Sequence, residues 1–254
     1  MTTVNCSIGK CKGLPQGRAP QPCNGHGVVY IDPVPAADLL LTTLPTIERL
    51  ALAYAPGATR DAWLAFFALD ARLASLVRSA SEPMLAQLRI AWWREALEAD
   101  ASAWPQGDPI LGALANWAGH HRGLASLADG WEALTAPAPL DAKAMARFAR
   151  GRADGIGALA DHVGAGRFGN EARQLATDWS LADLSTRFSR EDERELARSL
   201  ALGSASRPPK APRALRPLAV LRATAHGRLA RGGNGEDRSP LTMLGAMRAG
   251  LLGR

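Results

Sequence analysis

Residues that favour β-strands are scarce in this sequence of 254 residues. The chain has 2 tyrosines and 5 phenylalanines, aromatic residues make up 6% of it, and no segment alternates regularly between apolar and polar residues. Alanine and leucine predominate instead, and both favour helices. The composition therefore predicts an all-α fold, a single-domain bundle of about eight helices.

Long apolar runs are missing as well. No run approaches the roughly 20 residues that a transmembrane helix requires, and the N-terminus lacks the apolar core of a signal peptide. Hydrophobic residues still make up 47% of the chain, which suffices for one large core or two small ones. We therefore expect a cytoplasmic protein.

Cysteine is confined to the N-terminal end, at Cys6, Cys11 and Cys23, with His26 close behind. The spacing C-x4-C-x11-C-x2-H fits no common zinc finger, and nothing nearby looks able to pack around a metal. The surrounding sequence is rich in Gly, Pro and polar residues. Residues 1–30 are therefore predicted to be a disordered extension.

The positive charge is concentrated at the C-terminus. From Arg207 to the end there are nine Arg and one Lys against Glu236 and Asp237, a balance of +8 that leaves −2 for the first 206 residues of a chain whose net charge is +6. A solvated basic face is the expected explanation. The charge also leaves open contact with an anionic membrane surface or with nucleic acid.

Apolar residues recur at helical spacing along most of the chain. The segment RDAWLAFFALDARLASLVR predicts a helix over 60–78, and QLRIAWWREALEA, residues 87–99, belongs to the next one, for which Pro83 suits the first turn. The segment 141–164 is predicted to be a helix loosened by Gly151, Gly155 and Gly157. One or two further helices are predicted within 110–134, and single ones within 46–55, 170–189, 190–200, 213–230 and 240–252.

Two adjacent tryptophans, Trp92 and Trp93, occupy the middle of the second of these helices. Neighbouring helical residues lie about 100° apart, so Trp92 shares a stripe with Leu85 and Leu88, and Trp93 lies elsewhere. Tryptophan at helical spacing usually belongs to a core. We therefore expect the pair to widen the buried face of this helix.

The segment MLAQLRIAWWREALEADASAWPQGDPILGAL, residues 84–114, resembles the squalene/phytoene synthase family, in which a helix close to L-R-x-x-W-W-R-x-x-L precedes a Pro-rich turn and another helix. RDAWLAFFALDARLASLV is similar to that family's first motif helix and ATDWSLADLSTRF to its second. GRADGIGALADHVG and RALRPLAVLRA resemble its glycine-bearing helix and C-terminal portion. The resemblance implies an isoprenoid-synthase-like domain over residues 31–205, completed by the basic helices of 206–254.

Active members of this family join two isoprenyl diphosphates head to head, which implies Mg²⁺ ions held by two aspartate-rich helices. In this sequence the D-x-x-x-D positions of the first helix fall on Leu73 and Val77. On the second helix they fall near Arg187 and at Arg190 or Glu191. Since arginine in place of a magnesium ligand reverses the local charge, we expect no metal, cofactor or catalytic residue.

The acids that remain on these two helices are not spaced to share one ion. Asp61 and Asp70 point to opposite faces, and Asp178 and Asp183 are about 140° apart. Neither pair can readily bind one Mg²⁺ ion.

The resemblance implies a family member without prenyltransferase catalysis that acts as a lipid- or protein-binding scaffold. The sequence is similar to the complex I assembly factor branch of the family, in which the helix before the Trp segment is apolar where synthases have aspartates. A role in respiratory-complex assembly is therefore one form that the scaffold function could take. The expected ligand is an isoprenoid or lipid-like molecule or a partner protein, with a peripheral membrane location as one alternative. The side chains expected to line the former substrate cavity or its rim are Arg89, Trp92, Trp93 and Arg94.

Two other functions remain as alternatives. One is an active head-to-head prenyltransferase of the squalene or phytoene type, which would use Mg²⁺. The other is a basic helical protein that binds nucleic acid through its C-terminal segment, although the arginines there alternate with leucines as in a packed amphipathic helix.

Overall fold

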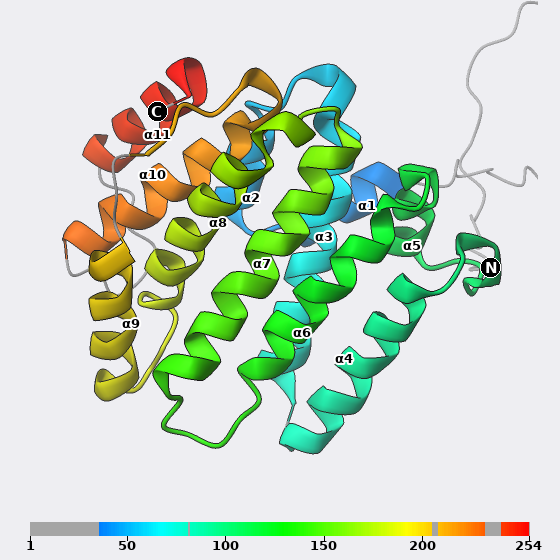
Figure 1. The fold of residues 1–254 in the computed structure, drawn as a ribbon, viewed down its shortest axis with the longest axis horizontal. Coiled ribbons are helices and arrows are strands. Elements are labelled where there is room, and N and C mark those ends of the chain that lie inside the picture. The colour runs from blue at the N-terminus through cyan, green and yellow to red at the C-terminus, as the bar shows by residue number, and fades with distance from the viewer. Residues whose placement is uncertain (1–35, 81, 205–207, 232–239, 254) are drawn as a thin grey trace, which may run out of the picture. The chain divides into compact units, whose positions relative to one another are not determined.

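The computed structural model describes residues 36–80, 82–204, 208–231 and 240–253. Within these residues the regular structure is entirely helical, which confirms the predicted all-α fold (Figure 1). The predicted N-terminal extension, with Cys6, Cys11, Cys23 and His26, lies outside the described residues. In the ranges described here, no helix is both long and apolar enough to cross a bilayer.

Eleven α-helices are present in the described residues, more than the eight or so predicted. They are α1 (Ala36–Thr43), α2 (Thr46–Leu52), α3 (Gly57–Ser79), α4 (Pro83–Glu98), α5 (Pro109–Leu114), α6 (Ala125–Ala133), α7 (Ala142–His162), α8 (Gly169–Leu184), α9 (Glu191–Ser204), α10 (Arg216–Ala230) and α11 (Pro240–Leu252). Helix α1 lies before the first predicted segment. The segment 110–134, predicted as one or two helices, contains two, because Ala118 and Gly119 adopt left-handed backbone angles, φ 47° and 87°, between them.

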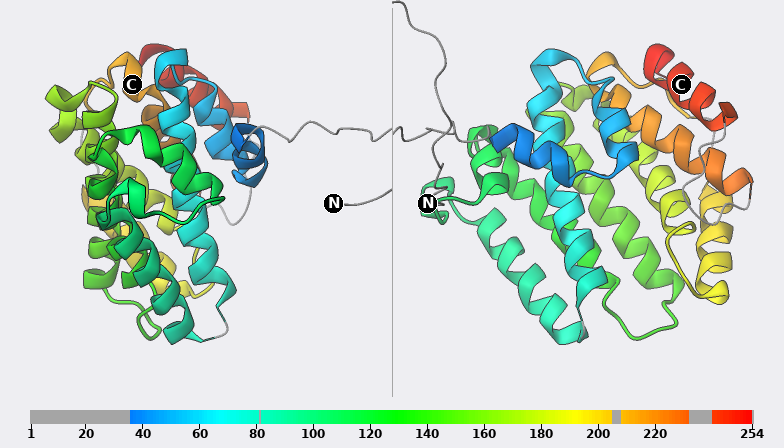
Figure 2. Two further views of the ribbon diagram at one scale, coloured as in Figure 1. Left: turned by 90° about the vertical axis from the view of Figure 1, so that its right-hand side faces the viewer. Right: turned by 180° about the vertical axis from the view of Figure 1, so that it is seen from behind.

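The long helices lie side by side in the order α4, α6, α7, α8 and α10, and α11 packs on α10 (Figure 1). Helix α3 packs across α4, α6 and α7, as the view from behind shows (Figure 2). Its first half is buried almost all round, with Trp63, Phe66 and Phe67 in mutual ring contact. The indole N–H of Trp63 donates a 2.8 Å hydrogen bond to the carbonyl of Ala214, which ties the C-terminal helices to the core.

Glycines bring α6 and α7 into close contact. A Cβ added to Gly151 of α7 would lie 2.3 Å from the carbonyl oxygen of Ser126 and 2.7 Å from the Cα of Gly130, both in α6. These partners are backbone atoms that cannot move aside. Helix α7 is continuous from Ala142 to His162, so the expectation that Gly151 loosens it was wrong: the missing side chain permits tighter packing.

Helix α4 lies at the edge of this row and buries only one side. Trp93 and Leu97 face the core, being 3% and 0% exposed. Leu85, Leu88 and Trp92 are 42%, 63% and 44% exposed. The prediction that both tryptophans widen the buried face is therefore wrong for Trp92, because no described helix covers that side of α4.

Replacing Gly151 by alanine should lower the free energy of unfolding by about 1–3 kcal/mol, because the new methyl group meets fixed backbone atoms. Gly112→Ala is the matched control, since nothing lies within 4 Å of its added Cβ. That change should be neutral or stabilise by up to about 1 kcal/mol. Urea unfolding of both variants makes the comparison, and equal effects would contradict the close contact of α6 with α7.

Candidate functional site

A single arginine occupies the middle of the helical bundle. Arg152 of α7 is 1% exposed, and its guanidinium carbon lies 3.8 Å from the ring centroid of Trp179 on α8. The rings of Phe148 and Trp131 are 5.2 and 5.6 Å away. A cation over aromatic faces is stabilised by the ring quadrupoles, and Arg is the residue most often found in that position.

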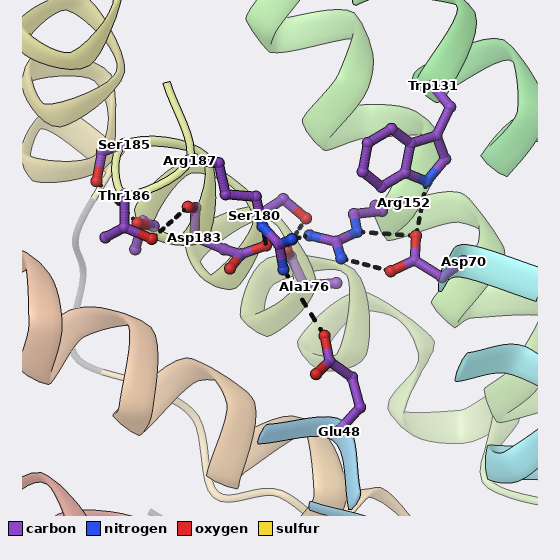
Figure 3. A network of polar contacts seen from close by, with 11 residues as sticks. Glu48, Asp70, Trp131, Arg152, Ala176, Ser180, Asp183, Ser185, Thr186 and Arg187 are labelled. Atoms are coloured by element: carbon purple, nitrogen blue, oxygen red, sulfur yellow. Dashed lines mark hydrogen bonds and ion pairs between the residues drawn. The ribbon is translucent and has the colours of Figure 1, made fainter. Parts of the chain in front are cut away.

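Two carboxylates on different helices neutralise Arg152 (Figure 3). Asp70 of α3 accepts hydrogen bonds from Nε at 3.1 Å and Nη2 at 2.5 Å, and its Oδ1 also accepts from the indole N–H of Trp131 at 2.7 Å. Asp183 of α8 accepts from Nη1 at 3.0 Å. The guanidinium group therefore bridges α3 and α8 from α7, with both acids nearly as buried as the arginine.

The network continues from Asp183 towards the surface. Arg187, one turn later in the chain, donates from Nε to the same Asp183 oxygen at 2.8 Å. Its Nη2 lies 3.7 Å from a carboxylate oxygen of Glu48 on α2, which is 6% exposed (Figure 3). Three acids and two arginines thus form one connected cluster, which we call the charge network: Glu48, Asp70, Arg152, Asp183 and Arg187.

The pKa values of Asp183 and Glu48 are shifted in opposite directions. Burial opposes ionisation of Asp183, but Arg187 and Arg152 outweigh it and hold the pKa of Asp183 below its ordinary value. For Glu48 burial dominates: it raises the pKa above 4.5, Arg187 offsets only part of this, and Asp183 adds repulsion. The pKa of Arg187 is raised, chiefly by Asp183. Of these two acids, Glu48 is therefore protonated first as the pH falls.

A cavity of about 660 Å³ adjoins this end of the charge network. Glu48, Asp183 and Arg187 belong to both, and Arg228 of α10 adds a further cation. The rest of the lining is mainly apolar, with hydroxyl groups from Thr46, Thr186 and Thr224 and the exposed Arg49. The apolar lining residues are Pro45, Ile47, Leu50, Trp179, Leu221, Ala225 and Met243.

The residues predicted from the tryptophan helix do not line this cavity. Trp92 and Trp93 are in edge-to-face contact, with ring centroids 5.2 Å apart. They lie on α4, at the opposite end of the row of helices from the cavity. Arg89 is exposed. Arg94 ties α4 to α6 at the surface through Asp129 at 3.0 Å and Glu132 at 2.6 Å.

A second, smaller cavity lies beside α4 and α6. It measures about 320 Å³ and is lined by polar side chains that include Gln87, Glu132 and Lys143. None of the four predicted residues lines it.

Sequence reasoning considered Asp70 and Asp183 only as metal ligands and missed Arg152 and Glu48. Asp70, Arg152 and Asp183 each have apolar or small residues on both sides, as in LDA, GRA and ADL. A charged residue on an otherwise buried helical face needs a partner of opposite charge. That rule would have marked these residues as members of a buried pair, although not which partner each one takes.

The carboxylates of α3 and α8 do not fit the magnesium site that the family resemblance implies. Mg²⁺ needs carboxylate oxygens free to coordinate it. Both oxygens of Asp70 accept hydrogen bonds from Arg152, and one of them also accepts from Trp131. The Oδ2 atom of Asp183 accepts from both Arg152 and Arg187. Asp61, the other acid on α3, is exposed on the opposite side, as expected.

Comparisons of the chain with known protein families, with characterised proteins and with solved structures found no match.

Replacing Arg152 by methionine should lower the free energy of unfolding by about 3–5 kcal/mol, because it leaves Asp70 and Asp183 buried without their cation. Arg94→Met is the control: it also removes an arginine that joins two acids across helices, but at the surface. That change should cost no more than about 1 kcal/mol. Chemical denaturation measures both, and equal losses would show that Arg152 does not hold the buried acids.

Glu48 should make stability depend on pH. Because its pKa is raised in the folded state, its favourable contribution is complete below about pH 4.5 and is lost as pH rises through the raised value. Glu48→Gln should therefore be more stable than the native protein at neutral pH, and this advantage should shrink as pH falls towards 4.5. Unfolding measured across this range tests the effect, with the exposed Glu95→Gln as control. An unchanging difference between the native protein and Glu48→Gln would contradict it.

Proposed function

We propose that the chain is a non-catalytic member of the squalene/phytoene synthase family, with an isoprenoid-synthase-like fold, whose cavity binds an amphiphile with an apolar tail and an anionic head. The observation that supports the proposal is the buried arginine bridge between α3 and α8, which takes up their acids with a cation of the chain itself. Helices α3 and α8 resemble the two motif helices, and Arg152 joins an acid from each.

The chemistry of the charge network argues against a diphosphate held through metal ions. A synthase needs surplus negative charge on the protein to hold several Mg²⁺ ions. Here the buried Arg152 and the partly exposed Arg187 offset the acids of α3 and α8, and the raised pKa of Glu48 favours its neutral form. The charge network therefore lacks the surplus that magnesium binding requires.

The cavity has features suited to an amphiphile. Its volume of about 660 Å³ lies within the range of small-molecule sites, which are mostly apolar with a few convergent polar groups. Leu50, Leu221 and Met243 offer surface to a hydrocarbon chain. Arg187 and Arg228 offer planar donor groups that suit a phosphate or carboxylate head. These contacts favour a lipid-binding scaffold over one that only binds a protein.

Binding of farnesyl diphosphate in the absence of Mg²⁺ tests the proposal. We expect the native protein to bind it in isothermal titration calorimetry and Arg228→Gln to bind at least about tenfold more weakly, because a charge-assisted hydrogen bond to the head is lost. Arg89→Gln, a change of the same type on α4, is the control. If only Arg89→Gln weakened farnesyl diphosphate binding, the ligand site would be on the tryptophan helix α4 and not in the cavity.

The alternative function, a head-to-head prenyltransferase, is tested with the same material. Incubation of the protein with Mg²⁺ and farnesyl or geranylgeranyl diphosphate should leave the substrate unconsumed. Consumption at enzymatic rates would overturn the non-catalytic part of the proposal. Absence of binding by the native protein, to farnesyl diphosphate and to a long-chain alkyl phosphate alike, would overturn the cavity as the ligand site.

A further inference from the structure

The outward face of α11 is almost entirely apolar. Six of the residues described on this helix are exposed, and Arg248 is the only polar one among them. Leu244 and Leu251 are each 60% exposed. The other exposed apolar side chains of the helix are Met243, Met247 and Leu252. We call these five apolar residues, together with Arg248, the α11 face.

The opposite side of the helix is firmly packed, so the exposure does not result from a loosely attached segment. Ala246 and Ala249 are 0% and 2% exposed. Gly250 lies so close to Tyr54 of α2 that an added Cβ would be 2.2 Å from its ring. The carbonyl of Gly253 accepts a 2.8 Å hydrogen bond from the amide of Ala211. The α11 face is thus presented outwards by a fixed scaffold.

Charge separates this face from the other exposed apolar stripe of the protein. The described residues 208–231 and 240–253, which include α10 and α11, contain six Arg and one Lys and no acid. On α4, by contrast, the exposed Leu88 and Trp92 share their helix with exposed Glu95 and Glu98. Anionic lipid attracts the first pattern and repels the acids of the second.

We propose that the α11 face is a docking surface for an anionic lipid membrane. Helices that lie in a membrane interface combine a continuous apolar face with flanking basic residues. With 13 residues, α11 is too short to span a bilayer, so it would lie parallel to the surface with its leucines and methionines among the acyl chains. Arg248 and two exposed basic residues next to α11, Lys210 and Arg231, would then contact the lipid phosphates.

The α11 face also adjoins the cavity. Met243 belongs to both, since it is 42% exposed on α11 and lines the cavity. A membrane that held the α11 face would therefore bring its lipids to the edge of the cavity. This second step, lipid entry from the membrane, rests on the proposed function, whereas the docking itself does not.

Flotation with lipid vesicles tests the docking. The native protein should float with phosphatidylcholine vesicles that contain phosphatidylglycerol, less with phosphatidylcholine alone, and less at high salt. The double variant Leu244→Ser/Leu251→Ser should bind the anionic vesicles at least about tenfold more weakly, because two leucines no longer enter the acyl region. Leu88→Ser on α4 is the matched control, since Leu88 is 63% exposed, and it should bind like the native protein.

Three results would overturn the docking surface. These are no binding by the native protein, equal binding by the double variant, and loss of binding in Leu88→Ser but not in the double variant. Light scattering adds a fourth: a native dimer that the double variant converts to a monomer, without vesicle binding, would assign the α11 face to a second copy of the chain.

The vesicle experiment uses no cavity ligand, so it separates the two proposals. Vesicle binding without farnesyl diphosphate binding would remove the proposed function and leave the docking surface. The reverse result would remove the docking surface alone.

Discussion

A guanidinium group deep in a helical bundle loses its hydration and must recover that energy from neighbouring groups. Arg152 recovers it from Asp70 on α3, Asp183 on α8 and the ring of Trp179. Because these partners belong to α3 and α8 whereas Arg152 belongs to α7, one side chain joins three helices. The rest of the architecture around the cavity depends on this arrangement, since Asp183 in turn orients Arg187.

The charge network leads from the interior of the protein to the cavity. Arg152 lies at its inner end and Glu48 at its outer end, and Asp183 and Arg187 connect them. An anion bound beside Arg187 would favour the neutral form of Glu48 still further, because both compete for the same cation. Ligand binding and protonation of Glu48 are therefore expected to be coupled through one arginine, within a site built on a rigid core.

The sequence was sufficient for the helices themselves. Apolar spacing placed the helix that contains Trp93 and predicted its start at Pro83, because these signals are local. The exposure of Trp92 depends on which helices lie beside α4, and spacing on one helix carries no such information. Whether 110–134 holds one helix or two stayed open, because the break depends on a left-handed Ala118, which composition does not indicate.

The candidate site was harder to predict for a related reason. Asp70 and Asp183 were compared only with acids on their own helices, whereas their partner Arg152 lies 82 and 31 residues away in the chain. Pairing across such separations is decided by tertiary packing. The cavity likewise combines α2, α8, α10 and α11, so no contiguous motif describes it.

The cation that joins α3 to α8 is a side chain of the protein, so it cannot dissociate as a metal ion can. A divalent ion that joins two helices exchanges with the medium, so its occupancy follows the supply of that ion and competition from nucleotides and chelating metabolites. The guanidinium of Arg152 belongs to the polypeptide and stays protonated throughout the physiological range. The link between α3 and α8 should therefore persist through changes in magnesium concentration that would weaken a bridge made by a bound ion.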